Sequence, residues 1–188
     1  MVQKKDYLIG ALVGFLTGVL VLRILYFLEI NFKFQEIIFL LLIPVLWALG
    51  VWLGGFLSKW IPFFNQFGKF ATIGFLGAAI DFSLLNFISH ATGIIAGVTV
   101  GWINIPGFLI AVLNNYFWNK FWVFKHKSTG IFADLPKFFG ITLMGLFLNT
   151  VVLVILTSVS LGFNNQLWLN ISKVGANVIV MIWNFIGY

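Results

Sequence analysis

The sequence predicts an all-α, polytopic membrane protein with six transmembrane helices. Of its 188 residues, 61% are hydrophobic and only 9% are charged, and the mean hydropathy is +1.07. Soluble domains carry roughly 25% charged residues, so this chain has too little polar surface to cover a water-soluble globule. The backbone N–H and C=O groups at the open edges of a sheet would have no hydrogen-bond partner in lipid. The sequence also lacks the polar and apolar alternation of a membrane barrel, so the spans are expected to be helices.

Each predicted helix is an apolar segment near the roughly 20 residues that cross the hydrocarbon core. The six segments cover residues 7–28, 36–58, 67–89, 96–118, 137–160 and 167–188. The start of the fourth is the least defined, because Gly93 to Gly101 is rich in glycine and small residues and also fits a re-entrant or interfacial turn. The first segment is too long for a signal-peptide core and no cleavage site follows it, so we interpret it as a retained span.

Basic residues gather in alternate loops and predict one orientation in the cell (cytoplasmic) membrane. The loops after the third and fifth segments contain no Lys or Arg. The other side holds the aromatic stretch NNYFWNKFWVFKHK and most lysines, namely Lys4, Lys5, Lys59, Lys69, Lys120, Lys125, Lys127 and Lys137. The positive-inside rule therefore predicts that both termini are cytoplasmic. The net charge of +6 reflects this topology, and we expect no nucleic-acid partner.

A motif in the third segment recurs about 70 residues later, which is typical of an internal repeat. Lys69-Phe70, Gly77 and Asp81 recur as Lys137-Phe138, Gly145 and Asn149, and Asn115 recurs as Asn184. We predict two hairpin repeats, about 67–124 and 137–188, within a four-helix domain at 63–188. Residues 1–62 form an appended N-terminal hairpin that ends at Pro62. Both copies start on the same side, so they are expected to be parallel repeats.

Three segments, FGKFATIGFLGAAIDF, KFWVF and KFFGITLMGLFLNT, resemble the GtrA-like family of polytopic membrane proteins over about residues 67–188. The chain is also similar to the membrane domain of some polyprenyl-phosphate sugar synthases. The resemblance implies a four-helix domain that flips a polyprenyl-phosphate-linked monosaccharide across the membrane for cell-surface polysaccharide glycosylation, beside a membrane glycosyltransferase. Two departures concern the helix exits: Lys120 stands where the family often has Arg, and the chain stops at Tyr188 before a second basic, aromatic tail.

A layer of polar residues is predicted in the outer half of the membrane, about 8–12 Å from the helix ends at 1.5 Å per residue. An ionisable group at such a depth costs roughly 3 kcal/mol unless it has a partner or water. The candidate substrate-binding residues are Lys173, Arg23, Asp81, Asn104, Asn149, Asn170 and Trp102. In one hypothesis Lys173, with Arg23, attracts the lipid phosphate. The carboxylate and amides would then bind sugar hydroxyls or hold the cations, and Trp102 would stack on a sugar ring. In the other, compatible with it, a buried Asp81–Lys173 pair locks the repeats together.

A second polar layer is predicted at the cytoplasmic face. As a functional site it would receive the anionic lipid carrier, and its phosphate-facing or lipid-facing members would be Lys69, Asn115, Asn119, Lys120 and Lys137. The alternative is that these lysines only set the topology and attract anionic headgroups, at about 1 kcal/mol per residue.

The sequence offers no candidate catalytic, metal or cofactor site. Cysteine is absent, His90 and His126 are isolated, and no serine has an evident base, so we expect the chain not to be an enzyme. Three functions remain open: a flippase for a polyprenyl-phosphate sugar, a non-transporting anchor or scaffold for a glycosyltransferase, and a small-solute exporter centred on Asp81. Lys173 and Arg23 argue against cation export, since they would repel cations. The expected partners are the sugar lipid, membrane lipids, a glycosyltransferase and, because four helices form a thin enclosure, a second copy of the chain.

Overall fold

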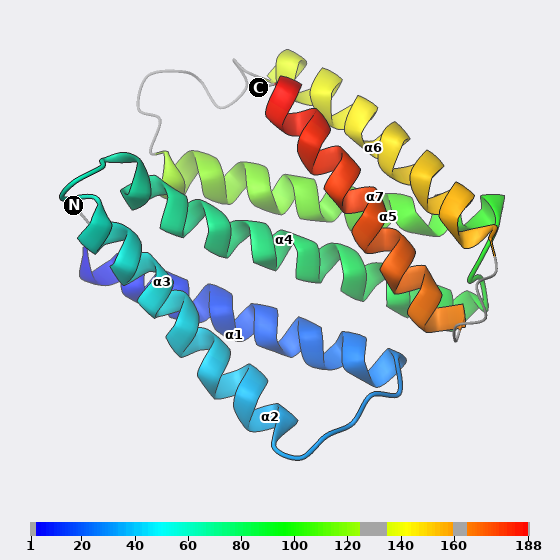
Figure 1. Ribbon diagram of the computed structural model, residues 1–188, viewed down its shortest axis with the longest axis horizontal. Coiled ribbons are helices and arrows are strands. Elements are labelled where there is room, and N and C mark those ends of the chain that lie inside the picture. The colour runs from blue at the N-terminus through cyan, green and yellow to red at the C-terminus, as the bar shows by residue number, and fades with distance from the viewer. Residues whose placement is uncertain (1–2, 125–134, 160–164, 188) are drawn as a thin grey trace. The chain divides into compact units, whose positions relative to one another are not determined.

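The computed structural model describes residues 3–124, 135–159 and 165–187, and in these ranges all regular secondary structure is helical (Figure 1). The predicted all-α fold of a polytopic membrane protein is therefore confirmed. The helices are α1 (Lys4–Phe27), α2 (Gln35–Ile37), η1 (Ile38–Leu42), α3 (Ile43–Leu57), α4 (Phe63–Thr92), α5 (Val98–Trp118), η2 (Asn119–Val123), α6 (Leu135–Thr157) and α7 (Asn165–Gly187), where η1 and η2 are π-helical turns.

The expected segments match these helices, because α2, η1 and α3 follow one another without a break, as do α5 and η2. Among the described residues, four stretches are long and apolar enough to cross a membrane: Lys4–Phe27, Gln35–Leu57, Phe63–Thr92 and Val98–Val123. A shorter apolar stretch, Thr142–Thr157, lies in α6. Gly93 and Gly97 both have positive φ in the turn before α5, a conformation that glycine adopts without strain. This turn places the start of α5 at Val98, within the region that the sequence left undefined.

Close packing between α1 and the second helical segment depends on glycines four residues apart. A Cβ atom added to Gly10 would lie 3.1 Å from Val51, and one added to Gly14 would lie 2.7 Å from the Cα of Pro44. At Gly18 it would overlap the carbonyl of Phe39. Small residues at this spacing let helix backbones approach each other. As the contacts move forward along α1 they move backward along α3 and η1, so the two helices are antiparallel.

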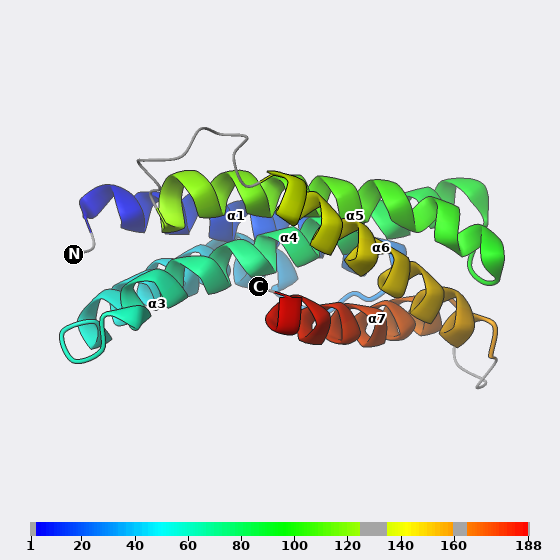
Figure 2. The same cartoon turned by 90° about the horizontal axis from the view of Figure 1, so that it is seen from above.

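The chain forms two compact units. The first contains Met1–Ser83 and Ile110–His126, and its core joins α1, α3, α4 and η2 through residues such as Val13, Val51 and Ile73. The second contains Leu84–Leu109 and Lys127–Tyr188, and its core joins the end of α4 and the start of α5 to α6 and α7, which lie side by side (Figures 1 and 2). The division of the sequence into a hairpin at 1–62 and a repeat domain at 63–188 stays a prediction.

Candidate functional sites

Lys173 lies at the centre of a buried polar cluster in the second unit. Its side chain leaves the buried face of α7 and is 0% exposed. The ammonium donates hydrogen bonds to Oδ1 of Asn104 on α5 (2.5 Å) and to Oδ1 of Asn149 on α6 (3.0 Å). The face of the Phe108 ring lies 5.9 Å away, measured to the ring centroid. The cluster therefore brings together three of the predicted substrate-binding residues from three helices.

The two asparagines are fixed by further hydrogen bonds. Asn104 donates through Nδ2 to Oδ1 of Asn149 (3.0 Å) and to the hydroxyl of Thr150 (3.2 Å). Asn149 in turn donates to Oδ1 of Asn177 (2.7 Å). Because an amide has a donor end and an acceptor end, these bonds hold both carbonyl oxygens toward Lys173. The oxygens take the place of water around an ammonium that apolar surroundings would otherwise destabilise.

Asn170 belongs to a separate polar cluster of the second unit. Asn86 on α4 and Asn170 on α7 exchange reciprocal hydrogen bonds of 2.8 Å. Gln166 donates to Oδ1 of Asn86 (2.8 Å), and Ser89 donates to Oε1 of Gln166 (3.3 Å). The sequence placed Asn170 in one layer with Lys173, but its described partners are these amides. Asn86 and Gln166 were not predicted, although the spacing of Asn86 and Ser89 puts both on one face of α4.

Trp102 does not join the Lys173 cluster. Its side chain is 73% exposed, whereas Asn104 is fully buried. Residues two positions apart on a helix point about 200° apart, so the two side chains leave α5 on different faces. Trp102 and Asn104 are close along the chain but not on one face of the helix, and the stacking of Trp102 on a sugar ring stays a prediction.

A second buried lysine lies in the first unit and has a charged partner that the sequence reading missed. The ammonium of Lys69 on α4 is 2.8 Å from Oδ2 of Asp6 on α1. Trp122 donates to Oδ1 of Asp6 (2.9 Å), and the backbone N–H of Gln3 donates to Oδ2 (2.8 Å). Asp6 is 0% exposed and Lys69 only 3%. The carboxylate is thus paired and hydrogen-bonded, as a buried charge needs to be.

The pair shows that Lys69 is not exposed at the surface of the first unit, and its predicted role in receiving the lipid carrier stays a prediction. Its side chain is buried, because α1 packs against α4 and brings Asp6 to it. A signal for Asp6 was present: it is an acidic residue at the start of the first span, on the same predicted face of the membrane as Lys69.

Arg23 and Asp81, the other ionisable residues predicted in the outer layer, both lie in the first unit. Arg23 is exposed, and its guanidinium lies 5.0 Å from the ring centroid of Tyr26 and 5.1 Å from that of Phe27. This arrangement is typical of a cation–π contact. Asp81 is buried in α4 at 4% exposure. The pairing of Asp81 with Lys173, and the attraction of a phosphate by Arg23 together with Lys173, stay predictions.

The remaining predicted cytoplasmic residues differ in their surroundings. Asn115 packs so tightly against Gly77 that a Cβ atom on the glycine would overlap its amide, which gives the repeated glycine a packing role. Asn119 is half-buried in η2. Lys120 is half-buried and donates to the hydroxyl of Tyr116 (3.2 Å). Lys137 lies near the start of α6, but its side chain is not among those that the structure describes. Residues 125–134 also lie outside the described residues.

The protein belongs to the class of integral membrane proteins with a polar interior. Its helices are long enough to span a membrane, and its buried lysines are held by polar side chains. Residues 69–188 match the family of the GtrA/DPMS transmembrane domain, and the chain belongs to this family. The predicted resemblance is confirmed. The match begins at Lys69, so α1 to α3 lie outside it.

A comparison with curated proteins supports the same relationship. Over 130 residues the chain is 31% identical to a dolichol-phosphate mannosyltransferase of Pyrococcus furiosus. The aligned region covers 69% of this chain and 33% of that protein, so the chain spans about a third of the length of this relative. No solved structure matches the chain.

Proposed function

We propose that the chain moves a polyprenyl-phosphate-linked monosaccharide across the cytoplasmic membrane for glycosylation of cell-surface polysaccharide. The family links the chain to membrane functions that concern polyprenyl-phosphate sugars. The observation that carries the proposal is Lys173, a lysine with no exposed surface whose ammonium is held by amide oxygens of α5 and α6. A phosphate that passes through lipid needs a cation in the membrane interior, and this ammonium is one.

The asparagines around Lys173 suit a site that alternates between empty and occupied. Without substrate, the oxygens of Asn104 and Asn149 satisfy the ammonium. A phosphate oxygen is a stronger acceptor for an ammonium than a neutral amide is, so it would displace one or both. The released amides can donate and accept, as sugar hydroxyls do. Because Lys173 is fully buried, access requires a rearrangement of the helices that cover it.

Purified protein in vesicles tests the proposal. A labelled polyprenyl-phosphate sugar is placed in one leaflet, and its appearance in the other is measured for the native chain, Lys173→Met and Lys33→Met. Both variants lose one positive charge, but Lys33 is exposed. We expect Lys173→Met to abolish movement while Lys33→Met keeps the native rate. Native transport by a folded Lys173→Met protein would show that the phosphate role is wrong.

A second candidate is a membrane anchor or scaffold for a glycosyltransferase, with no transferase chemistry in this chain. It is favoured by one observation: the relative is a mannosyltransferase, and the matching region is only a third of its length. The same vesicles separate the two candidates. A scaffold would move no sugar lipid alone and would instead raise the activity of a co-reconstituted glycosyltransferase.

A further inference from the structure

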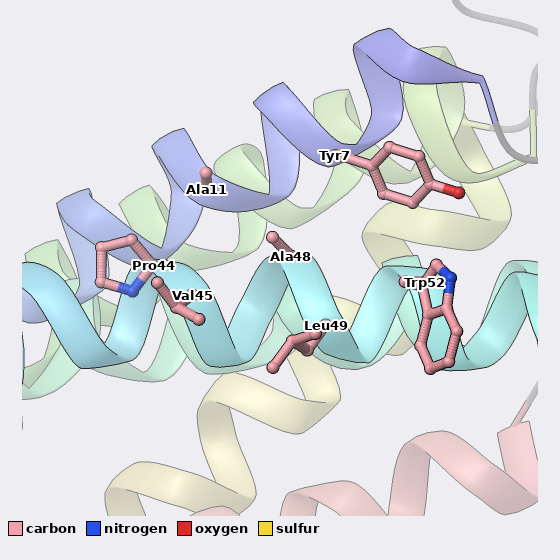
Figure 3. Close-up of a pocket in the computed structure, with 7 residues that line it drawn as sticks. All are labelled: Tyr7, Ala11, Pro44, Val45, Ala48, Leu49 and Trp52. Carbon is pink, nitrogen blue, oxygen red and sulfur yellow. The ribbon is translucent and has the colours of Figure 1, made fainter.

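An open apolar groove runs between α1 and α3 in the first unit (Figure 3). Its volume is about 360 Å³, and its lining residues are Tyr7, Ala11, Pro44, Val45, Ala48, Leu49 and Trp52. The groove exists because Ala11 and Ala48 are small where the two helices meet, while larger side chains stand on either side. Val45 and Leu49 are 54% and 50% exposed, so the groove faces the surroundings of the unit.

One end of the groove is aromatic and basic. Figure 3 shows the rings of Tyr7 and Trp52 at the same end, with Pro44 at the other. Phe56 stacks on Trp52 with the ring centroids 5.6 Å apart, and the ammonium of Lys59 lies 5.0 Å from the centroid of Phe56. The indole, the ring and the ammonium therefore form a continuous path from the groove to Lys59.

Two more lysines lie at this end. Lys4 and Lys5 are exposed in the first turn of α1, immediately before Asp6 and Tyr7. Because α1 and α3 are antiparallel, the first turn of α1 lies level with the end of α3, where Lys59 follows. The groove thus has an apolar length and three exposed lysines near one end, a pattern that matches a lipid with an anionic head.

We propose that this groove binds one anionic phospholipid of the surrounding leaflet, with an acyl chain along Ala11 and Ala48 and the phosphate near Lys4, Lys5 and Lys59. Charge selects this occupant, since lysines near a membrane surface attract anionic lipids, about fivefold in binding for each lysine. A second copy of the chain, inserted in the same orientation, would bring its own three lysines against these and be repelled. The site lies outside the residues that match the family, and it does not depend on the proposed transport function.

The chain has no cysteine, so one reporter can be placed in the groove. A fluorophore is attached to Leu49→Cys, and the protein is placed in phosphatidylcholine vesicles. The vesicles contain a small fraction of a lipid with brominated chains, which quench fluorescence on contact. This brominated lipid is either phosphatidylglycerol or phosphatidylcholine. The reference reporter is Phe147→Cys, at an exposed position of α6. We expect brominated phosphatidylglycerol to quench the groove reporter at a far lower mole fraction than brominated phosphatidylcholine, and the reference reporter to respond equally to both.

Two single variants make a matched pair for the basic end. Lys59 and Lys33 are both exposed, and each ammonium lies about 5 Å from a phenylalanine ring centroid, at 5.0 and 4.8 Å. We expect Lys59→Gln to weaken the preference for phosphatidylglycerol about fivefold and Lys33→Gln to leave it unchanged. The triple variant Lys4→Gln, Lys5→Gln, Lys59→Gln should remove the preference.

Several results would overturn this inference. Equal quenching by the two lipids, or equal effects of Lys59→Gln and Lys33→Gln, would show that the lysines select no lipid here. Displacement of phosphatidylglycerol by a trace of polyprenyl phosphate would make the carrier lipid the occupant. Loss of quenching as the protein self-associates would indicate a second copy of the chain. None of these readouts measures transport, so the proposed function is tested separately by its own experiment.

Discussion

The two units each bury a lysine, but they satisfy its charge with different chemical groups. In the first unit Lys69 meets the carboxylate of Asp6, which Trp122 also holds. In the second unit Lys173 donates to the neutral oxygens of Asn104 and Asn149. The first arrangement pairs opposite charges between α1 and α4, and the second surrounds a charge with dipoles from α5 and α6.

The difference in partners distinguishes the structural role proposed for Lys69 from the role proposed for Lys173, whose partners would be exchanged for a phosphate. Removing one member of a buried ion pair leaves the other charge uncompensated, which costs several kcal/mol, so the Asp6–Lys69 pair is suited to hold α1 against α4. An amide oxygen binds an ammonium less strongly than an anion does. In the proposed function Lys173 would give up its amide partners to an incoming phosphate, whereas Lys69 already has a carboxylate in place.

The largest expected effect comes from Asp6→Asn, which turns the first site into a copy of the second. Lys69 would lose its counter-charge, and we expect the free energy of unfolding to fall by about 3–5 kcal/mol. Denaturant unfolding in detergent measures it. Adding Lys69→Met should recover much of the loss, and Glu36→Gln, at an exposed position, is the charge-matched control. A native-like stability for Asp6→Asn would mean that the pair does not hold the helices together.

The next largest effect is expected for Asn149→Leu, because Asn149 accepts from Lys173 and Asn104 and donates to Asn177. Leucine has nearly the same size but leaves these buried groups short of a partner, which should cost about 2–3 kcal/mol. The same unfolding assay applies. Phe147→Leu, at an exposed position of the same helix, serves as control, and equal effects of the two would argue against the amide network.

Trp122→Phe keeps an aromatic ring beside Lys69 but removes the N–H that bonds Asp6, together with part of the buried indole. The carboxylate retains Lys69 and the backbone of Gln3, so we expect the lost hydrogen bond to contribute about 1.5 kcal/mol to the loss of stability. In the Asp6→Asn background, Trp122→Phe should cost less stability, because the side chain that accepts from the indole N–H is then uncharged. A double-mutant cycle measures this coupling, and strictly additive losses would contradict it.

The smallest change in stability, and the sharpest test of function, is Asn149→Asp. It gives Lys173 a carboxylate like that of Lys69 but removes the N–H that bonds Asn177. Because a buried ion pair gains little net stability and a lost hydrogen bond costs about 1 kcal/mol, the free energy of unfolding should shift by about 1 kcal/mol. Transport of the sugar lipid should nevertheless stop, because the new anion occupies the ammonium that a phosphate needs. Full transport by this variant would show that Lys173 need not be exchangeable.

The sequence by itself determined that the chain is a helical membrane protein of this family and where its helices run. Each span must satisfy its own backbone in lipid, so hydropathy over about 20 residues reveals it locally, and Pro62 and Gly93 mark the breaks. The position of Lys173 within an apolar segment, and so its depth in the membrane, was also predicted from the sequence.

Only the tertiary structure decided which polar groups meet. Depth along a helix was predictable from 1.5 Å per residue, but the direction in which a side chain leaves the helix depends on how neighbouring helices rotate and pack. That is why Asn104 and Asn149 meet Lys173, Trp102 points outward and Asn170 pairs with Asn86. It is also why Lys69, whose partner Asp6 is far away in the sequence, is buried.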